Sequence, residues 1–228
     1  MKKTFPLEQQ IFYIMAFTGG ALASFAILRT NGILGSAQTS NLAELVLDLI
    51  GRDFFEVGLR IIAMLIYAFG LALTRIIPKR TKWSLKQISA FVDIFGLLLI
   101  GAMPEDLNPI IALWPIFFMA SMQWNAFPGA RGYISASIFS TNNYRQVVTG
   151  LTDYLLDKEP SSKERALFFT GTLLSFHAGV GLTALGIARF GFHAIWFFTL
   201  PVLLALPLIR KEQHLLRTNL LPLLLPRP

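Results

Sequence analysis

The sequence predicts an all-α membrane protein of about six transmembrane helices, arranged as two inverted three-span repeats that each contain a re-entrant or broken half-helix. Three observations predict this fold: long apolar segments, a polar pattern that recurs along the chain, and basic residues gathered at the ends of apolar segments. With 54% hydrophobic and 14% charged residues and a mean hydropathy of +0.57, the chain of 228 residues carries too little charge to cover a soluble globule of this size.

Six segments are apolar and close to the length of about 20 residues that a helix needs to cross a bilayer. They cover residues 9–28, 57–77, 86–103, 108–127, 165–188 and 191–209. The first is long enough to span, so we expect a retained helix and not a cleaved signal. The end of the chain is apolar but carries Pro222, Pro226 and Pro228, which predicts a cytoplasmic interfacial tail over residues 211–228.

Two breaks interrupt this pattern, at residues 30–50 and 130–156. Each break begins with small and polar residues and continues as a short amphipathic helix, expected at 41–50 and at 143–156. Because lipid offers no partners to backbone N–H and C=O groups, a break at membrane depth must be buried in protein or line water. We therefore expect the two breaks to face each other in the interior.

The two breaks repeat one pattern. A shift of 102 residues places Arg29 on Arg131, Thr39 on Thr141 and Asn41 on Asn143 without a gap. This predicts two repeats, residues 1–104 and 105–210, within one integrated membrane domain. Inverted repeats with interrupted helices recur in secondary transporters.

The distribution of charge predicts the topology, because basic residues favour the cytoplasmic side. Lys2 and Lys3 precede the first span, and five basic residues surround the loop after the second. Both groups lie inside only if the first break turns back on its own side of the membrane. Glu105 and Asp106 then fall outside, and both termini are cytoplasmic. The expected location is the inner membrane of a bacterial cell, with membrane lipid as the surrounding partner.

The polar residues of the breaks are the candidate site. Gln38, Thr39, Ser40 and Asn41 open the first short helix, and Thr141, Asn142 and Asn143 open the second. One interpretation is that these residues only cap the helices. The other is that two half-helix N-termini, with their partial positive charge, bind an anion or a polar solute. Gln123 and Asn125 lie near the same level, where they form interhelical hydrogen bonds or line a pathway.

Four charged or titratable residues add further candidates. Arg29 and Arg131 each follow a span, where they reach lipid headgroups or act as electrostatic filters at opposite mouths. Asp93 lies inside a predicted span, and His177 in another is a conceivable partner for a proton relay; Asp93 also lies close to Lys86 at the cytoplasmic end. The acids of the short helices, Glu44, Asp48 and Asp153, are expected to face an aqueous vestibule.

Several function classes find no support in the sequence. Cysteine is absent, and the three histidines are scattered, so we expect no metal site, no cofactor and no enzymatic activity. The net charge of +7 comes from residues at segment ends, which fits a membrane surface and not nucleic acid.

The motifs themselves resemble a known family. Ala37-Gln38-Thr39-Ser40-Asn41 resembles the AQTGN signature of the YoaK-like bacterial membrane proteins. Gln123-Trp124-Asn125-Ala126-Phe127, followed by Thr141-Asn142-Asn143, is similar to the second Q-N-x-F and TGN element of that family, with Ser40 and Asn142 in place of its glycines. The resemblance implies a polytopic membrane protein of unknown function.

These features predict a transporter or channel-like protein for a small polar or anionic solute. The alternative is a membrane scaffold or sensor that transports nothing, in which the breaks are packing devices only. Neither the solute nor the oligomeric state follows from the sequence.

Overall fold

The computed structural model describes residues 6–30, 32–33 and 38–224, with side chains up to residue 218, and it is 85% helical. Its helices are α1 (Leu7–Thr30), α2 (Gln38–Gly51), α3 (Phe54–Arg80), α4 (Leu85–Ala102), α5 (Pro109–Ala126), α6 (Thr141–Asp157), α7 (Pro160–Phe190), the 3₁₀ helix η1 (Phe192–Phe198) and α8 (Thr199–Leu224). A hairpin of β1 (Gly129–Ala130) and β2 (Tyr133–Ile134) lies between α5 and α6.

Local sequence signals set the start of three long helices. Asp53, Ser84 and Asn108 precede α3, α4 and α5, and each accepts a hydrogen bond from a backbone N–H of the first turn. Pro109 follows Asn108 at the first helical position, where a missing N–H costs nothing. These three helices begin at residues 54, 85 and 109, within three residues of the starts at 57, 86 and 108 that the apolar segments predict.

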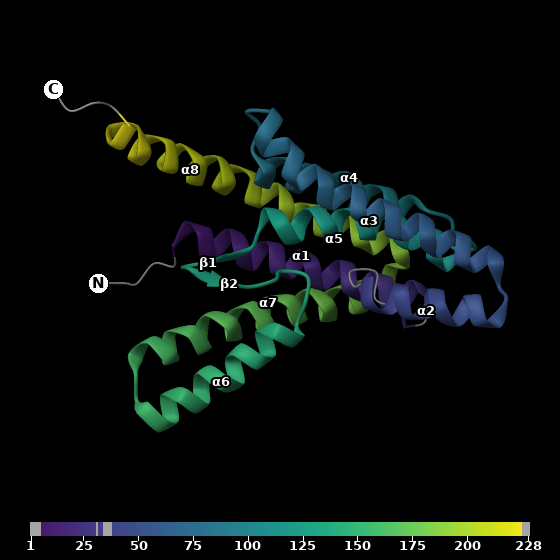
Figure 1. The fold of residues 1–228 in the computed structure, drawn as a ribbon, viewed down its shortest axis with the longest axis horizontal. Helices are drawn as coiled ribbons and strands as arrows, with labels where there is room; N and C mark the ends of the chain where they lie inside the picture. The colour runs from purple at the N-terminus through teal and green to yellow at the C-terminus, as the bar shows by residue number, and fades with distance from the viewer. Residues whose placement is uncertain (1–5, 31, 34–37, 225–228) are drawn as a thin grey trace.

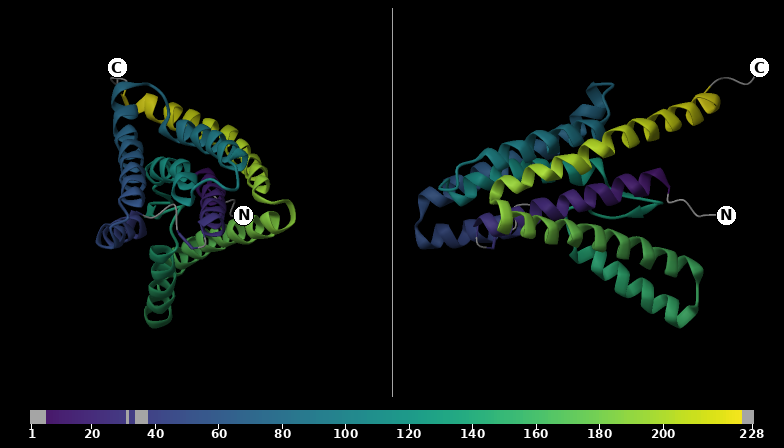
Figure 2. Two further views of the ribbon diagram at one scale, coloured as in Figure 1. Left: turned by 90° about the vertical axis from the view of Figure 1, so that its right-hand side faces the viewer. Right: turned by 180° about the vertical axis from the view of Figure 1, so that it is seen from behind.

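The long helices lie roughly along one axis, with their connections at two ends (Figure 1). α1 begins and α8 ends at the same end of the molecule, which also holds the connections between α3 and α4 and between α6 and α7 (Figures 1 and 2). We call this the terminal end. The opposite end holds α2 and the connections from α4 to α5 and from α7 to α8.

α1 and α5 occupy the middle of the molecule and run in opposite directions (Figure 2). Gln123 near the end of α5 donates to the carbonyl of Met15 in α1, and Arg29 at the end of α1 donates to the carbonyl of Pro104 before α5. In the most apolar 18-residue stretch of α1, 72% is buried. The same share is 22–39% in the other four helical segments that are long and apolar enough to cross a membrane. α1 is therefore enclosed by protein.

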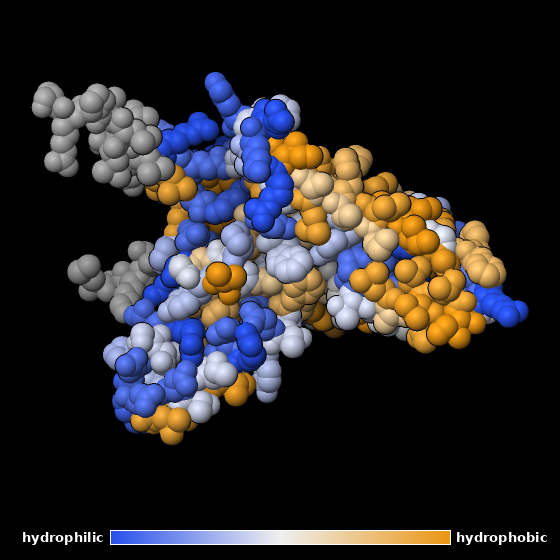
Figure 3. Space-filling view, in the orientation of Figure 1, coloured by the Kyte–Doolittle hydropathy of each residue, from blue (hydrophilic) through white to orange (hydrophobic). Residues whose placement is uncertain are grey.

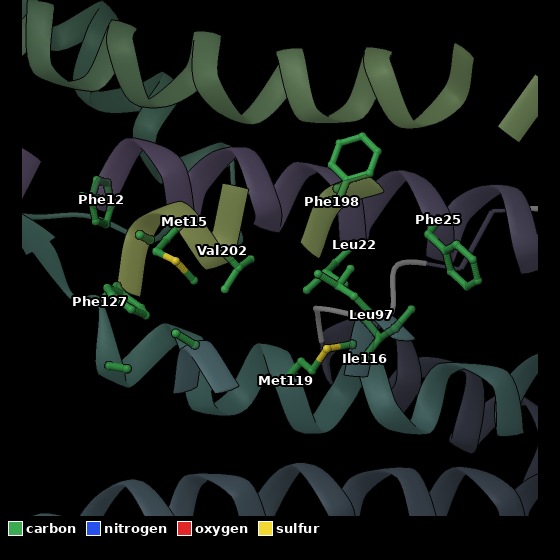
Figure 4. Packing of buried hydrophobic residues seen from close by; sticks show 14 of the residues in the cluster. Phe12, Met15, Leu22, Phe25, Leu97, Ile116, Met119, Phe127, Phe198 and Val202 are labelled. Carbon is green, nitrogen blue, oxygen red and sulfur yellow. The ribbon is translucent and has the colours of Figure 1, made fainter. Parts of the chain in front are cut away.

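The core lies along these two central helices (Figure 4). Side chains of α1 and α5 meet there with residues of α4, η1 and α8, among them Phe12, Met15, Leu22, Phe25, Leu97, Ile116, Met119, Phe198 and Val202. Glycines let α1 and α7 approach closely: a Cβ on Gly20 would lie 1.9 Å from the carbonyl oxygen of Phe176, and one on Gly179 would lie 2.0 Å from that of Phe17. Close backbone contact of this kind is typical of membrane helices.

Five of the described helical segments are long and apolar enough to cross a membrane by length and composition. They are α1, α3, α4, α7 and the run Phe192–Thr218. The expected sixth span is the central helix α5, where Pro109, Pro115, Gln123 and Asn125 dilute the apolar content. A multi-pass membrane protein follows, while the count of six spans stays a prediction.

The two breaks differ from the expectation in detail. α6 begins at Thr141, two residues earlier than expected, and is preceded by the unpredicted hairpin. Arg131 and Gly132 form its turn and both have positive φ (57° and 80°), as in the tight turns that join twisted strands. In the first break, residues 31 and 34–37 lie outside the described residues, as do Lys2 and Lys3. The predicted tail is helical up to Leu224, because α8 continues through it.

Candidate functional site

A cavity of about 820 Å³ lies between the starts of α2 and α6. Both breaks line it: the described lining residues are Gln38 and Thr39 of α2, Thr141, Asn142 and Arg145 of α6, and the aromatic residues Tyr67, Trp124 and Phe139. At the surface where α6 begins, weakly polar and hydrophilic residues lie next to the apolar surface of α2 and α3 (Figure 3). The structure thus brings residues that lie about a hundred positions apart in the chain to one cavity.

The first turn of α2 is held by its own amides. Asn41 is buried and donates through Nδ2 to Oε1 of Gln38 at 3.1 Å and to the carbonyl of Arg60 at 3.3 Å. Asn41 therefore ties α2 to α3 and does not line the cavity. Nε2 of Gln38 is buried and has no hydrogen-bond partner within the described part of the chain. Ser40 is half-buried and is not among the described lining residues.

The first turn of α6 is built differently from the capping interpretation, which is wrong here. Ser140 is the N-cap residue, its side chain makes no capping hydrogen bond, and Thr141, Asn142 and Asn143 lie inside the helix. Buried Asn143 instead accepts from Oγ of Ser135 and donates to two carbonyls of the preceding loop, each at 2.8 Å. The first-turn N–H groups thus keep their positive potential at the cavity.

The charge of the cavity is positive. Arg145 is exposed, and its Nη2 lies 2.9 Å from Oδ1 of Asn142, one turn earlier on the same helix. The described lining residues include no acid. Trp124 and Phe139 pack edge to face with ring centroids 5.2 Å apart and form an apolar wall. The cavity therefore combines a cation, amides and hydroxyls with a rigid aromatic side.

Gln123 and Asn125 separate into different surroundings. Gln123 is fully buried and donates to the carbonyl of Met15 at 2.8 Å and to Oγ of Ser137 at 2.9 Å. This is the interhelical hydrogen bond that was one of its two expected roles. Asn125 is exposed and donates to the carbonyl of Ser121 in its own helix. Neither belongs to the described lining of the cavity.

Arg29 and Arg131 lie at opposite ends of the molecule, and both are engaged. The guanidinium of Arg29 lies 4.9 Å from the ring centroid of Phe192, in addition to its bond to Pro104. The backbone N–H of Arg131 donates to Oε2 of Glu8, and its guanidinium forms an ion pair of 2.8 Å with Glu164. Each arginine thus ties an end of one central helix to the other half of the chain.

Asp93 and His177 are not joined by a hydrogen bond within the described residues. Asp93 is fully buried in α4, and both carboxylate oxygens lack a described partner, as does Oγ of Ser89 one turn earlier. His177 is exposed on α7, and its Nδ1 lies 2.8 Å from the carbonyl of Leu173. The proton relay between them stays a prediction without a contact to support it.

The acids of the short helices form ion pairs. Their side chains are also 23–47% exposed, and the expectation that they face an aqueous vestibule stays a prediction. Arg60 of α3 contacts Glu44 at 2.6 Å and Asp48 at 2.5 Å, and Arg165 of α7 contacts Asp153 at 2.5 Å. Arg60 is buried in the second turn of the candidate span Phe54–Arg80. The signal was present in the sequence, because an arginine inside an apolar segment needs an acidic partner.

Sequence reasoning missed Tyr67, Phe139 and Arg145. Tyr67 lies in α3 and Phe139 in the loop before α6, so only the tertiary arrangement brings them to the cavity. Arg145 carried a usable signal, because it follows Thr141 by one helical turn on a helix expected to start at the break.

Comparison with known sequences finds a family model that covers most of the chain. The sequence model of DUF1275, described as a protein of unknown function, matches residues 11–208. The chain belongs to the DUF1275 family. This DUF1275 match extends from α1 into α8 and includes both breaks and every described residue that lines the cavity. No curated protein and no solved structure matches the chain. The resemblance to YoaK-like proteins stays a prediction.

For this DUF1275 member the chemistry of the site is that of polar and cationic groups. Within the described ranges, no group of three His, Asp or Glu side chains is placed to hold a metal ion. The cavity offers hydroxyl, amide and guanidinium donors together with two helix N-termini, which suits the oxygens of an anion or of a small polar solute.

Proposed function

We propose that this chain is a transporter or channel-like protein that moves a small polar or anionic solute through the cavity between α2 and α6. One observation carries the proposal: the first turns of two separate short helices and Arg145 line the same cavity. A helix N-terminus attracts negative charge because its first N–H groups lack partners within the helix. Two such ends, a guanidinium and no described acid make the cavity selective for anions or for dipoles that present oxygen.

The packing supports an inverted repeat. α1 packs on α7 as α5 packs on α3, and α1 contacts α8 as α5 contacts α4. In each half the short helix lies against the long helix that follows it. Since α1 and α5 run in opposite directions, the chain enters the two breaks from opposite ends of the central helices, and both breaks reach the same cavity (Figure 1). Access to one site from opposite sides is the arrangement of inverted-repeat transporters.

The positions of the charges support a cytoplasmic terminal end. Lys79, Arg80 and Lys82 lie around the connection between α3 and α4, and Lys158 lies in the connection between α6 and α7, both at that end. Glu105 follows α4 at the opposite end. By the positive-inside rule, both termini then lie in the cytosol of a bacterial cell.

A membrane scaffold or sensor is the second candidate. The observation that favours it is the packing role of two buried amides: Asn41 ties α2 to α3, and Asn143 ties α6 to the loop before it. In this case the cavity is incidental. The protein is not an enzyme in either proposal.

Flux into proteoliposomes tests the transport proposal, with small anions, small amides and water as solutes. Arg145→Ala is expected to lower anion flux roughly tenfold, because a hydrogen bond to a charged group contributes about 1.5–3 kcal/mol. The matched control is Arg189→Ala, since Arg189 is exposed at the end of α7 and does not line the cavity. Equal flux in both variants, or no flux of any solute, contradicts transport through this cavity and favours the scaffold.

A further inference from the structure

A groove of about 920 Å³ lies between α3 and α4, with α5 as its floor. α3 and α4 contact each other only slightly, whereas each packs on α5. The groove is apolar along its length, with Phe91, Phe95 and Leu99 from α4 and Phe118 from α5. Phe91 and Phe95 are 51% and 69% exposed, so this side of α4 is open.

The length of the groove corresponds to one leaflet of a bilayer. Its lining follows α4 from Ile88 to Leu99, which is roughly 16 Å at 1.5 Å per residue. The hydrocarbon core of a bilayer is about 30 Å thick, so one leaflet supplies about half of that depth. An acyl chain that enters from the terminal end therefore fits the groove from headgroup level to the midplane.

Two cations stand at the polar end of the groove. Lys82 and Arg217 both line it there, beside Trp83, and neither forms an ion pair within residues 6–30, 32–33 and 38–218. Neighbouring Lys86, in contrast, is held by Glu212 at 2.8 Å. Exposed tryptophans are typical of the headgroup level. The unneutralised cations thus lie where a lipid phosphate would lie.

We infer that this groove is a specific site for an anionic phospholipid, with an acyl chain along α4 and the phosphate between Lys82 and Arg217. Gln213 and Ser84, which share a hydrogen bond at the same end, offer further polar contacts to the headgroup. A groove of about 470 Å³ over α1, between α7 and α8, has no cation among its described lining residues. The charge therefore assigns the anionic lipid to the groove over α5, and the site does not depend on the transport proposal.

Native mass spectrometry of the detergent-solubilised full chain tests the site, with phosphatidylglycerol and phosphatidylcholine added in turn. The wild-type protein is expected to retain phosphatidylglycerol preferentially. Lys82→Ala with Arg217→Ala should weaken that retention roughly tenfold, toward the level of phosphatidylcholine. The matched control is Arg75→Ala with Lys79→Ala, which removes two cations of the same region that do not line the groove.

A second variant keeps the inference testable if the double change impairs folding. Leu99→Trp fills the apolar part of the groove and should reduce retention of both lipids, while Lys82→Arg with Arg217→Lys should retain the preference. Equal retention of the two lipids by the wild type, or equal loss in the control pair, overturns the inference. A dimer in lipid-free detergent that Leu99→Trp dissociates also overturns the inference, because the groove is then occupied by a second copy of the chain.

Discussion

Nε of Arg60 on α3 lies 2.5 Å from Oδ2 of Asp48 on α2. The other half repeats this relationship between Arg165 on α7 and Asp153 on α6, with both members displaced by 105 residues. In each half an ion pair holds the short helix of the break against the long helix that follows. The position of the cavity between the two short helices therefore depends on these pairs.

The two pairs should differ in their contribution to stability. Arg60→Ala leaves Glu44 and Asp48 without their cation, and the Arg60 side chain is only 8% exposed. We expect this change to cost about 1–3 kcal/mol, below the full penalty of a broken buried pair because both acids are partly exposed. Arg165→Ala, with side chains 31% and 47% exposed, should cost less than about 1 kcal/mol. Thermal unfolding in detergent measures both, and equal losses contradict the assignment.

The close contact of α1 and α7 predicts opposite effects at two glycines. Gly179→Ala places a Cβ 2.0 Å from the carbonyl of Phe17, so the helices must separate, at about 1–3 kcal/mol. Gly181→Ala meets no atom within 4 Å and should stabilise the helix by about 0.5–1 kcal/mol. The melting temperatures of the two variants should therefore move in opposite directions. A shift in the same direction would show that the two helices do not meet at Gly179.

Gln123 is expected to be structural. Gln123→Leu removes two buried hydrogen bonds to Met15 and Ser137 and should cost about 1–3 kcal/mol. Asn125→Leu, two residues later on the exposed side, should change stability by less than about 0.5 kcal/mol. Proteolysis of the loop around Ser137 offers a second measurement, since loss of the bond to Gln123 should expose that loop.

We expect the Asp93 side chain to destabilise the fold. Its carboxylate is buried without a described partner, so Asp93→Leu should leave the melting temperature unchanged or raise it. If Asp93 takes part in proton coupling, the same variant loses any proton-dependent flux while the fold persists. A marked loss of stability contradicts the unpartnered state. Ser89→Ala is the matched control one turn away.

The topology can be measured directly, because the chain contains no cysteine. Lys82 lies in the connection between α3 and α4, and Lys158 in that between α6 and α7, both at the terminal end. Lys82→Cys and Lys158→Cys should therefore react with an impermeant thiol reagent only from the cytoplasmic side. Asp53→Cys lies at the opposite end, between α2 and α3, and should react from outside. Labelling of Asp53→Cys and Lys82→Cys from one side contradicts the proposed arrangement of the first half.

The helices were predictable because apolar length and turn chemistry are local. The segment expected at 57–77 is α3. The helix continues to Arg80 because the basic residues after the apolar segment still form helix. The recurrence of Thr39 and Thr141 at a fixed spacing also predicted that the two breaks share one place, and both residues line the cavity. A repeated pattern carries this information because equivalent segments take equivalent positions about a symmetry axis.

The roles of the polar side chains were not predictable. Asn41 and Asn143 have the residue type of a cap, yet tertiary contacts with Arg60 and with the loop before α6 recruit them instead. Tyr67 reaches the cavity only because α3 packs against α5, which no local pattern encodes. Side-chain partners across helices depend on the whole fold.

The enclosure of α1 has a consequence for biogenesis. α1 is synthesised before α5, α7 and α8, the helices that cover it. Until they arrive, buried polar residues such as Thr18 and Ser24 must face lipid or the insertion machinery. We therefore expect that residues 1–104 alone do not form a stable membrane unit, and that α1 reaches its native packing only after α8 has been inserted.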